Sequence, residues 1–386
     1  MAYLDNSATT KTDPAVISVM ADVMRDIYGN PSSLHGIGVK AERLMEQARK
    51  AVAGALHCSP QEIIFTSGGT EANNLVIRGV AEAYRQRGNH MVTSPVEHPS
   101  VYNVFQYLKQ KGWNITELPV DQFGRVHPED VVSAVTDETV LVSIMHVNNE
   151  VGTIQPVEEI GNRLKSFPKV LFHVDAVQSF GKIPLHPSSS RIDFLTISGH
   201  KFHGPKGIGC LYKRKNLTLP PLLLGGGQEQ GMRSGTENLP AIAGLAKAVL
   251  LAKETEEKFY PQYQAWKEMI LARVNSELNH VKVNGDIRDD GGAPYILNLS
   301  FPGLKSEVIV HALEKENVYV SSKSACSSKK EEPSRVLKAM GLTDQEALGS
   351  IRISMGRMNT EKELKQCCDA LVRVIPALQK VMKVHK

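Results

Sequence analysis

Hydrophobic residues in the first two thirds of the chain occur in short runs that are almost continuous. The runs are EIIFTS, HMVTSP, VLVSIMHV, VLFHVDA and FLTISG. Such runs are typical of strands in a parallel sheet, because helices cover both faces of the sheet and bury both sides of each strand. We therefore predict a strand at each of these five positions.

Helical patterns separate the predicted strands. Apolar residues recur every three to four positions in GVKAERLMEQARKAVAGAL and in EANNLVIRGVAEAYRQRG. Alternation of strands and helices predicts an open α/β fold with a mostly parallel central sheet. This large, ligand-binding domain is expected to cover residues 14–258.

The pattern changes after Ala241. Long helical segments continue to Leu278, and Pro261 should break or kink them because proline has no amide hydrogen. Shorter strands (YILNLSF, VYVSS, SIRISM) and helices (SEVIVHALEKE, TEKELKQCCDALVRVI) follow. They predict a smaller α+β domain, formed by residues 1–13 together with 259–386. The glycine-rich stretch GGGQEQGMRSGTEN is predicted to be a long functional loop.

Composition and charge exclude several classes of protein. The 386 residues are 41% hydrophobic and 22% charged, which is ordinary for a globular chain. The net charge of +4 comes from interleaved acidic and basic residues without a long basic block, so direct nucleic-acid binding is not expected. No apolar leader or membrane-spanning run is present, and the five cysteines follow no disulfide spacing. The sequence therefore predicts a cytoplasmic protein without a membrane partner.

Lys201 stands at the end of a predicted strand, in the glycine-rich segment ISGHKFHGPKGIG. A partly desolvated lysine in such a place can form a Schiff base, although most lysines are simply exposed. One cofactor that binds lysine as a Schiff base is pyridoxal phosphate, which requires a carboxylate at its pyridinium nitrogen. Asp175 in FHVDAVQS could supply this carboxylate, or it could only cap a helix. Gln178, one helical turn later, could donate to the phenolic oxygen of the same ring.

A second segment, TSGGTEANN, leads from a predicted strand through Gly68, Gly69 and Thr70 into a helix. Backbone amides at a helix N-terminus bind phosphate where glycines leave room, although an ordinary glycine turn has the same pattern. The segment matches neither GxGxxG nor a Walker loop, which argues against NAD and ATP. Ser198 and His200 could add donors to the same phosphate.

His98 follows a predicted strand, at the sheet edge where doubly wound folds bind their ligands. It could stack on a cofactor ring and move protons, unless it is only a polar loop residue. His200 and His203 are three residues apart, but no nearby carboxylate or thiol completes a metal site, so no metal is expected.

Cys326 lies in SSKSACSSKKEEPSRVL, a segment of small and charged residues. An exposed cysteine near positive charge tends toward the reactive thiolate, and Lys323, Lys329 and Lys330 supply such charge. The remaining cysteines lie among apolar residues or in helical patterns and are expected to be buried and inert. They are Cys58, Cys210, Cys367 and Cys368.

Arg352 is flanked by apolar residues on the predicted strand in SIRISMGR. A partly buried arginine usually pairs with a carboxylate. That carboxylate could belong to an amino-acid substrate or to a structural salt bridge, and the pattern does not choose between them.

Together these segments resemble cysteine desulfurases of the NifS/IscS type, within the aminotransferase-like fold-type I pyridoxal-phosphate enzymes. The resemblance covers almost the whole chain. It is carried by YLDNSATT, YGNPSSLHGIG, FTSGGTEANN, the pair Glu97–His98, HVNNEVGTIQP, HVDAVQ, SGHKFHGPKGIG, GGGQEQGMRSGTEN, SSKSACSS and IRISMGR. It implies a homodimer that converts L-cysteine to L-alanine with pyridoxal 5′-phosphate and forms a persulfide on Cys326.

The resemblance also implies a role for each candidate residue. Lys201 would hold the cofactor, Cys326 would be the nucleophile, and His98 would stack on the ring and relay protons. The other cofactor contacts would come from Gly69, Thr70, Asp175, Gln178, Ser198, His200 and, across the subunit interface, Thr236. The substrate carboxylate would be held by Asn149 and Arg352.

Two features depart from the family. Lys323 stands where the family usually has glycine, which could alter loop motion or lower the pKa of Cys326. The chain ends at LQKVMKVHK, without the longer tail by which housekeeping members hold the iron–sulfur scaffold protein. A dedicated acceptor such as a tRNA-thiolating enzyme is therefore expected, with the iron–sulfur scaffold as the other candidate.

Three other functions fit part of the sequence. Another lyase or an aminotransferase with the same cofactor would need Lys201 but not Cys326. A selenocysteine lyase would act on a closely related substrate. A non-catalytic assembly partner would not need Lys201, Asp175, His98 and Cys326 together, so the sequence favours an enzyme.

Overall fold

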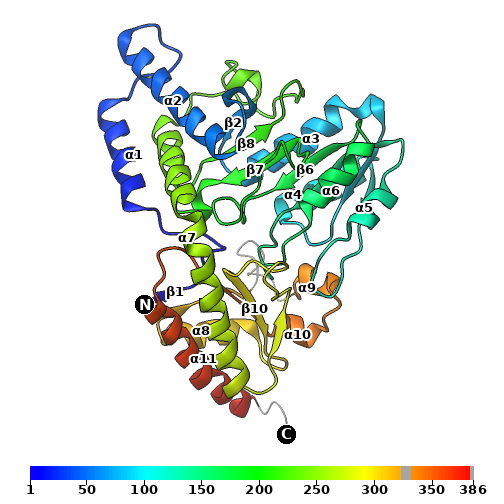
Figure 1. The fold of residues 1–386 in the computed structure, drawn as a ribbon, viewed down its shortest axis with the longest axis vertical. Coiled ribbons are helices and arrows are strands. Elements are labelled where there is room, and N and C mark those ends of the chain that lie inside the picture. The colour runs from blue at the N-terminus through cyan, green and yellow to red at the C-terminus, as the bar shows by residue number, and fades with distance from the viewer. Residues whose placement is uncertain (323–331, 383–386) are drawn as a thin grey trace.

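The computed structural model describes residues 1–322 and 332–382. The chain builds a large helix-covered sheet at one end of the molecule and a smaller group of sheets and helices at the other (Figure 1). Helix α7, Leu239–Glu277, runs from one part into the other (Figure 1). The predicted α/β fold with an additional α+β part is confirmed.

The large sheet has seven strands in the order β2-β8-β7-β6-β5-β3-β4. Their bounds are β2 Ile63–Thr66, β3 His90–Thr93, β4 Asn114–Glu117, β5 Thr139–Met145, β6 Leu171–Asp175, β7 Phe194–Ser198 and β8 Gly209–Lys213. Within this sheet only β8 runs antiparallel to its neighbours. All five hydrophobic runs form strands, so the mostly parallel sheet is confirmed.

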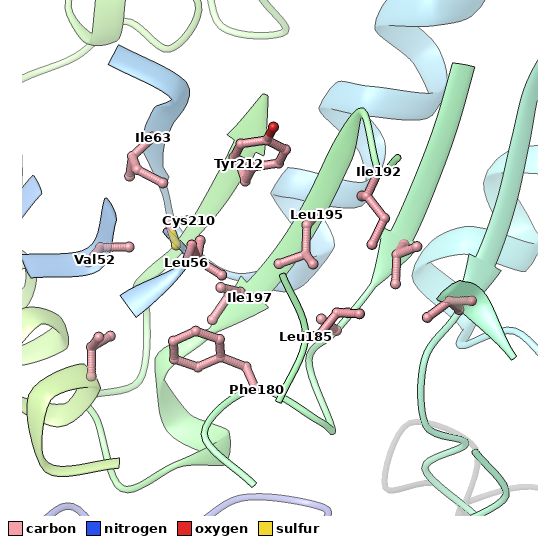
Figure 2. Packing of buried hydrophobic residues seen from close by; sticks show 14 of the residues in the cluster. Val52, Leu56, Ile63, Phe180, Leu185, Ile192, Leu195, Ile197, Cys210 and Tyr212 are labelled. Carbon is pink, nitrogen blue, oxygen red and sulfur yellow. The ribbon is translucent and has the colours of Figure 1, made fainter. Parts of the chain in front are cut away.

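Helices cover both faces of the large sheet. They are α1 Pro14–Asp26, α2 Gly36–Ala55, α3 Gly69–Ala83, α4 Pro99–Gln110, α5 Pro128–Ala134 and α6 Val157–Arg163, together with α7. In β2, Ile63 and Phe65 join a core with α2 and α7, whereas Ile64 joins a core with α3 and α4. Figure 2 shows side chains of the first of these cores on α2, β7 and β8. Both strand faces are buried, which explains the continuous apolar runs.

The smaller part contains an antiparallel sheet in the order β12-β10-β9 and a parallel pair, β1 with β11. Its strands are β1 Ala2–Tyr3, β9 Lys282–Asn284, β10 Ile296–Ser300, β11 Val318–Tyr319 and β12 Ser350–Ser354. Its helices are α8 Ser306–Lys315, α9 Arg335–Ala339, α10 Asp344–Leu348 and α11 Glu361–Val381. The first residues therefore belong to this part, although the division at residue 258 stays a prediction.

The break that Pro261 predicts does not occur, because α7 remains one helix of 39 residues. A proline inside a helix costs about 3 kcal/mol through a lost hydrogen bond and a ring clash. Packing on both sides of Pro261 offsets this cost. Val249 and Ala252 lie in the core of the large part, and Tyr263 and Trp266 lie in the core of the smaller part.

The predicted loop at residues 225–238 contains one short 3₁₀ turn, Glu229–Gly231. The Glu229 side chain is buried and pairs with Arg49 of α2 at 2.7 Å. It also accepts the backbone amide of Phe65 in β2 at 2.8 Å. A buried ion pair therefore fixes this loop against the large sheet. Within residues 1–322 and 332–382, no helix has both the length and the apolarity needed to cross a bilayer.

Candidate active site

A cavity of about 170 Å³ lies at the carboxyl ends of strands β5, β6 and β7. Parallel α/β sheets bind their ligands at this edge. Ser7 and Ala8 of the N-terminal segment and Arg352 of β12 complete its wall. The predicted residues that line it are Gly69, Thr70, His98, Asn149, Asp175, Gln178, Ser198, His200, Lys201 and Arg352.

Lys201 lies in a 3₁₀ turn, Gly199–Lys201, that directly follows β7. Its ammonium donates hydrogen bonds to the backbone carbonyls of Ser7 and Ala8, the latter at 2.9 Å. The same segment is bound to the turn through its backbone, because the amide of Thr10 donates to the carbonyl of His200 at 2.9 Å. The N-terminal segment therefore holds the lysine at the cavity.

Asp175 is the last residue of β6 and is 5% exposed. One carboxylate oxygen accepts the amide of Val177 at 3.0 Å, and the other accepts the side-chain amide of Asn73 at 2.8 Å. Burial raises the pKa of Asp175, and these hydrogen bonds and the charge of Lys201 only partly oppose it. A cationic ring nitrogen beside this carboxylate would favour the ionised form.

Gln178 lies in the turn after β6, also on the cavity wall. Its side-chain nitrogen donates to the carbonyl of Ser7 at 2.9 Å and carries a second hydrogen. Its side-chain oxygen is buried and has no hydrogen-bond partner in the described part of the chain. Buried polar atoms are normally paired, so this amide indicates a place for a polar group of a ligand.

The N-terminus of α3 forms another wall of the cavity. Its cap, Gly68, has a φ of 150°, in the region that favours glycine. A Cβ on Gly69 would lie 2.8 Å from Cγ2 of Val177, so this close approach also requires glycine. Ser198 and His200 face the same cavity, and burial lowers the pKa of His200 to about 4. The free helix amides and neighbouring side chains form a cradle suited to a phosphate.

His98 is the N-cap of α4, and its Nδ1 accepts the backbone amide of Ser100 at 3.2 Å. The hydroxyl of Ser100 lies 2.8 Å from the same nitrogen. Burial, followed by the charges of Lys201 and Arg335, lowers the pKa of His98 to about 4. The imidazole ring is therefore neutral near pH 7. Because Ser100 engages Nδ1 of His98, the other ring nitrogen, Nε2, remains to exchange a proton with a ligand.

Arg352 is 1% exposed and forms the structural salt bridge that its sequence context allowed. One guanidinium nitrogen donates to the carboxylate of Asp5 at 2.8 Å, and another donates to the backbone carbonyl of Asn149 at 2.8 Å. Its Nε is buried without a hydrogen-bond partner among the described residues. A structural ion pair thus exists, and one donor of an arginine on the cavity wall remains for a ligand.

One predicted residue that the structure describes is not brought to the cavity. Thr236 is exposed in the loop that Glu229 anchors, and it does not line the cavity. Cys326 lies outside the described residues. The other four cysteines are buried or, for Cys58, partly buried, and burial raises the pKa of each thiol. This environment agrees with the inert role predicted for them.

Several contacts at the site come from residues that the sequence analysis did not single out. Asn73 reaches the Asp175 carboxylate from the middle of α3, and Asp5, Ser7 and Ala8 reach Arg352 and Lys201 from the N-terminal segment. These residues lie in the segments FTSGGTEANN and YLDNSATT. The sequence signal for Asn73 was an asparagine inside a predicted helix, but its partner, Asp175, is far away in the sequence.

The chain matches the family described as aminotransferase class-V over residues 2–367. The chain belongs to this family. Among curated class-V relatives, a NifS/IcsS protein homolog of Lactobacillus delbrueckii subsp. bulgaricus is 46% identical over 383 residues, which cover 99% of each chain. The cysteine desulfurase IscS of Clostridium botulinum is 39% identical over 97% of this chain and 94% of that protein.

Solved class-V structures have the same architecture. A NifS-like protein superimposes with a TM-score of 0.92 at 38% identity and covers 98% of this chain and 100% of that one. The structure described as SspA in complex with cysteine has a TM-score of 0.82 at 35% identity, over 93% of this chain and 100% of that one. The predicted family and fold are confirmed.

Class-V enzymes of this kind depend on pyridoxal 5′-phosphate, and the cavity fits that cofactor. Its polar groups include a lysine amine, a buried carboxylate, the Gln178 amide with a hydrogen that Ser7 does not use, and a glycine-lined helix N-terminus. These groups match the aldehyde, the ring nitrogen, the phenolic oxygen and the phosphate of the cofactor.

Proposed function

We propose that this protein is a pyridoxal-phosphate-dependent cysteine desulfurase that converts L-cysteine to L-alanine and retains the sulfur on Cys326. The observation that carries the proposal is the convergence of Lys201, Asp175 and His98 on one cavity in a class-V chain. Each of the three is fixed by hydrogen bonds to a different segment of the chain. A lone lysine at a strand end would not support this function.

In the proposed site, Lys201 binds the cofactor covalently and Asp175 keeps its ring nitrogen protonated. Gln178 donates to the phenolic oxygen through the amide hydrogen that Ser7 does not use. The phosphate is held by Gly69, Thr70, Ser198, His200 and, from a second subunit, Thr236. When bound, the cofactor withdraws electrons from the α-carbon of the substrate, which weakens the bonds around it.

Proton transfers in the proposed reaction fall to His98 and Lys201. His98 is uncharged near pH 7, so it can take up a proton and does not repel a cationic ring that it stacks on. The carbonyls of Ser7 and Ala8 accept hydrogen bonds from Lys201 and would keep its amine near the substrate α-carbon.

The carboxylate of L-cysteine is proposed to bind Arg352 and Asn149. The unpaired Nε of Arg352 supports this assignment, because a buried guanidinium donor without a partner favours an anionic ligand. The ion pair between Arg352 and Asp5 holds the guanidinium in place and balances part of its charge.

Cys326 lies outside the described residues, so its role rests on the sequence resemblance. Its thiolate is proposed to attack the sulfur of the substrate. A sulfur–sulfur bond forms and the carbon–sulfur bond breaks. The electron pair of the broken bond stays on the carbon, which is then protonated, and alanine is released.

The test is an absorbance spectrum of the purified protein with and without L-cysteine, followed by assays for alanine and sulfide. We expect a band of Lys201-bound cofactor and one alanine for each sulfur transferred. Cys326→Ala should abolish desulfuration and keep the band, whereas Lys201→Ala should remove the band.

Other outcomes of the same test identify the competing functions. Alanine formation that survives alkylation of Cys326 would point to another lyase, and a keto acid would point to an aminotransferase. A higher turnover with selenocysteine than with cysteine would indicate a selenocysteine lyase. No cofactor band even after added pyridoxal phosphate would contradict the proposal.

The proposed active unit is a homodimer in the cytoplasm. Large apolar side chains are exposed near α1 and α2, including Met24 (58%), Tyr28 (72%) and Leu34 (98%), as expected of a surface that a second subunit covers. Mixing inactive Lys201→Ala and Thr236→Val chains should restore some activity if Thr236 acts across the interface. A strictly monomeric active species would contradict this arrangement.

The sulfur acceptor is proposed to be a dedicated protein, such as a tRNA-thiolating enzyme, with an iron–sulfur scaffold protein as the second candidate. Transfer of radiolabelled sulfur from the loaded desulfurase to each purified acceptor would distinguish them. Equal transfer to both would contradict a dedicated partner.

A further inference from the structure

Helix α9 begins with Arg335, whose side chain packs against helix α4. The guanidinium carbon of Arg335 lies 3.7 Å from the centroid of the Tyr102 ring in α4. A guanidinium nitrogen also donates to the backbone carbonyl of Glu97. Because Glu97 directly precedes His98, the N-cap of α4, Arg335 contacts this helix on both sides of His98 in the sequence.

The first turn of α9 is itself held in place. The hydroxyl of Ser334, its N-cap, donates to the carboxylate of Glu150 at 2.5 Å and accepts the amide of Leu337 at 3.4 Å. Glu150 follows Asn149, whose carbonyl accepts a hydrogen bond from Arg352. Arg335 therefore extends from a fixed point near the substrate side of the cavity to the helix that presents His98.

Burial lowers the pKa of Arg335, and Tyr102 and the nearby glutamates oppose this shift. An arginine remains protonated at all ordinary pH values. Burial raises the pKa of Glu97, the nearest acid on the α4 side, to about 8, so this carboxyl is protonated near neutral pH. Burial is the main cause of the low pKa of His98, and the charges of Lys201 and Arg335 add to it.

Other charged and titratable groups also face this region from the surrounding elements. Those that interact with His98, Glu97 or Arg335 are His200, Lys201, Asp175, Tyr102, Glu117 and Glu150. Glu150 is engaged by Ser334, and Glu117 by Gln106. Asp175 is tied to Asn73 and Val177. Arg335 contacts the α4 N-terminus directly, through the Tyr102 ring and the Glu97 carbonyl.

We propose that Arg335 is a positioning residue that fixes the N-terminus of α4 and whose permanent charge, added to the effect of burial, makes protonation of His98 less favourable. The inference rests on the proposed role of His98 in the desulfurase, but the charge state is a property of the chain itself. An uncharged imidazole can take up a proton beside the cofactor, whereas an imidazolium would repel a protonated ring.

The test is a pH titration of His98 in the full-length protein, with and without cofactor. NMR monitors the titration, and the variant His98→Gln assigns the resonance. Arg335→Gln keeps a donor for the Glu97 carbonyl but removes the charge. We expect it to raise the titration midpoint of His98, because a positive charge that disfavours protonation of the imidazole is removed. Arg335→Lys, which keeps the charge, should stay close to the wild type.

Arg85→Met is the matched control. Arg85 also stacks on an aromatic ring, with its guanidinium carbon 4.6 Å from the centroid of Trp113, but it is exposed in the 3₁₀ turn Arg85–Arg87 that follows α3. This variant should leave the His98 midpoint unchanged. If Arg335→Lys does not fold, Arg335→Gln still provides the comparison.

An unchanged midpoint in folded Arg335→Gln would overturn the inference, and so would an equal shift in Arg85→Met. Labelling by diethylpyrocarbonate, which reacts with uncharged imidazole, gives a second readout by mass spectrometry. Both readouts work on protein without substrate, so they test Arg335 even if the desulfurase proposal fails. If the wild type shows no desulfurase activity but Arg335→Gln shifts the His98 midpoint, the proposed function is contradicted and the inference about Arg335 is supported.

Discussion

Glu97 is a carboxylic acid enclosed between β3 and β5, and replacing it with glutamine should change how stability depends on pH. One of its oxygens accepts the Ser94 hydroxyl at 2.7 Å and the backbone amide of Met145 at 3.0 Å. The other oxygen is buried without a hydrogen-bond partner in the described part of the chain. Glutamine has nearly the same shape and keeps both hydrogen bonds, but it is neutral at every pH.

The size of the effect follows from the pKa of Glu97, which burial raises from 4.5 to about 8. The folded protein then retains a proton that the unfolded chain releases. This contribution to stability is complete below the unfolded pKa of 4.5 and is lost as the pH rises through about 8. Each pH unit in this window removes up to about 1.4 kcal/mol, or about 3 kcal/mol by pH 7.

Thermal unfolding of the wild type and Glu97→Gln, measured from about pH 5 to about pH 8, tests this reasoning. We expect similar midpoints at the acidic end and a growing advantage of the glutamine variant toward pH 8. Glu82→Gln, at an exposed carboxylate on α3, is the control and should show no such trend. A difference between wild type and Glu97→Gln that stays constant with pH would refute a protonated Glu97.

Three further substitutions test the site and its support. Asp175→Asn should weaken cofactor binding roughly 10–100-fold, because a hydrogen bond to a charged group is lost; titration with pyridoxal phosphate measures this. Glu229→Ala should lower the free energy of unfolding by about 3–5 kcal/mol, because Arg49 loses its buried partner, as urea unfolding would report. Gly69→Ala should cost about 1–3 kcal/mol of cofactor affinity through its contact with Val177.

Each of these predictions has a contrary outcome. Cofactor affinity within twofold of the wild type in Asp175→Asn would remove Asp175 from the ring-nitrogen role. A loss below about 1 kcal/mol in Glu229→Ala would mean that the pair with Arg49 is exposed to solvent in solution. Adding Val177→Ala to Gly69→Ala should restore affinity, and failure to do so would contradict a steric cause.

Much of the large sheet could be predicted from the hydrophobic pattern, because both faces of its strands are buried. Strand β4 escaped that pattern because its residues at the sheet edge are partly exposed. Strand β8 was not predicted either. It follows the loop after Lys201, and its five residues run antiparallel to both neighbouring strands. The break expected at Pro261 was wrong because local propensity cannot include the two cores that hold α7.

The candidate site was predictable where a residue type and a strand end coincide, as for Lys201 and Asp175. It was not predictable where the partner comes from a distant segment. The hydrogen bonds from Lys201 to Ser7 and Ala8 join residues almost two hundred positions apart. Arg352 and Asp5 are 347 positions apart, so no local pattern could choose between a salt bridge and a substrate for this arginine.

The N-terminal segment has a consequence for the order in which the protein matures during synthesis. Residues 2–7 leave the ribosome about three hundred positions before Val318, Tyr319 and Ser354, which they bind. Domains generally fold as their residues emerge, so the large sheet can form while Ser7 and Ala8 still lack a fixed position. The pocket around Lys201, whose wall includes Ser7, Ala8 and Arg352, is therefore completed only when β12 has been translated.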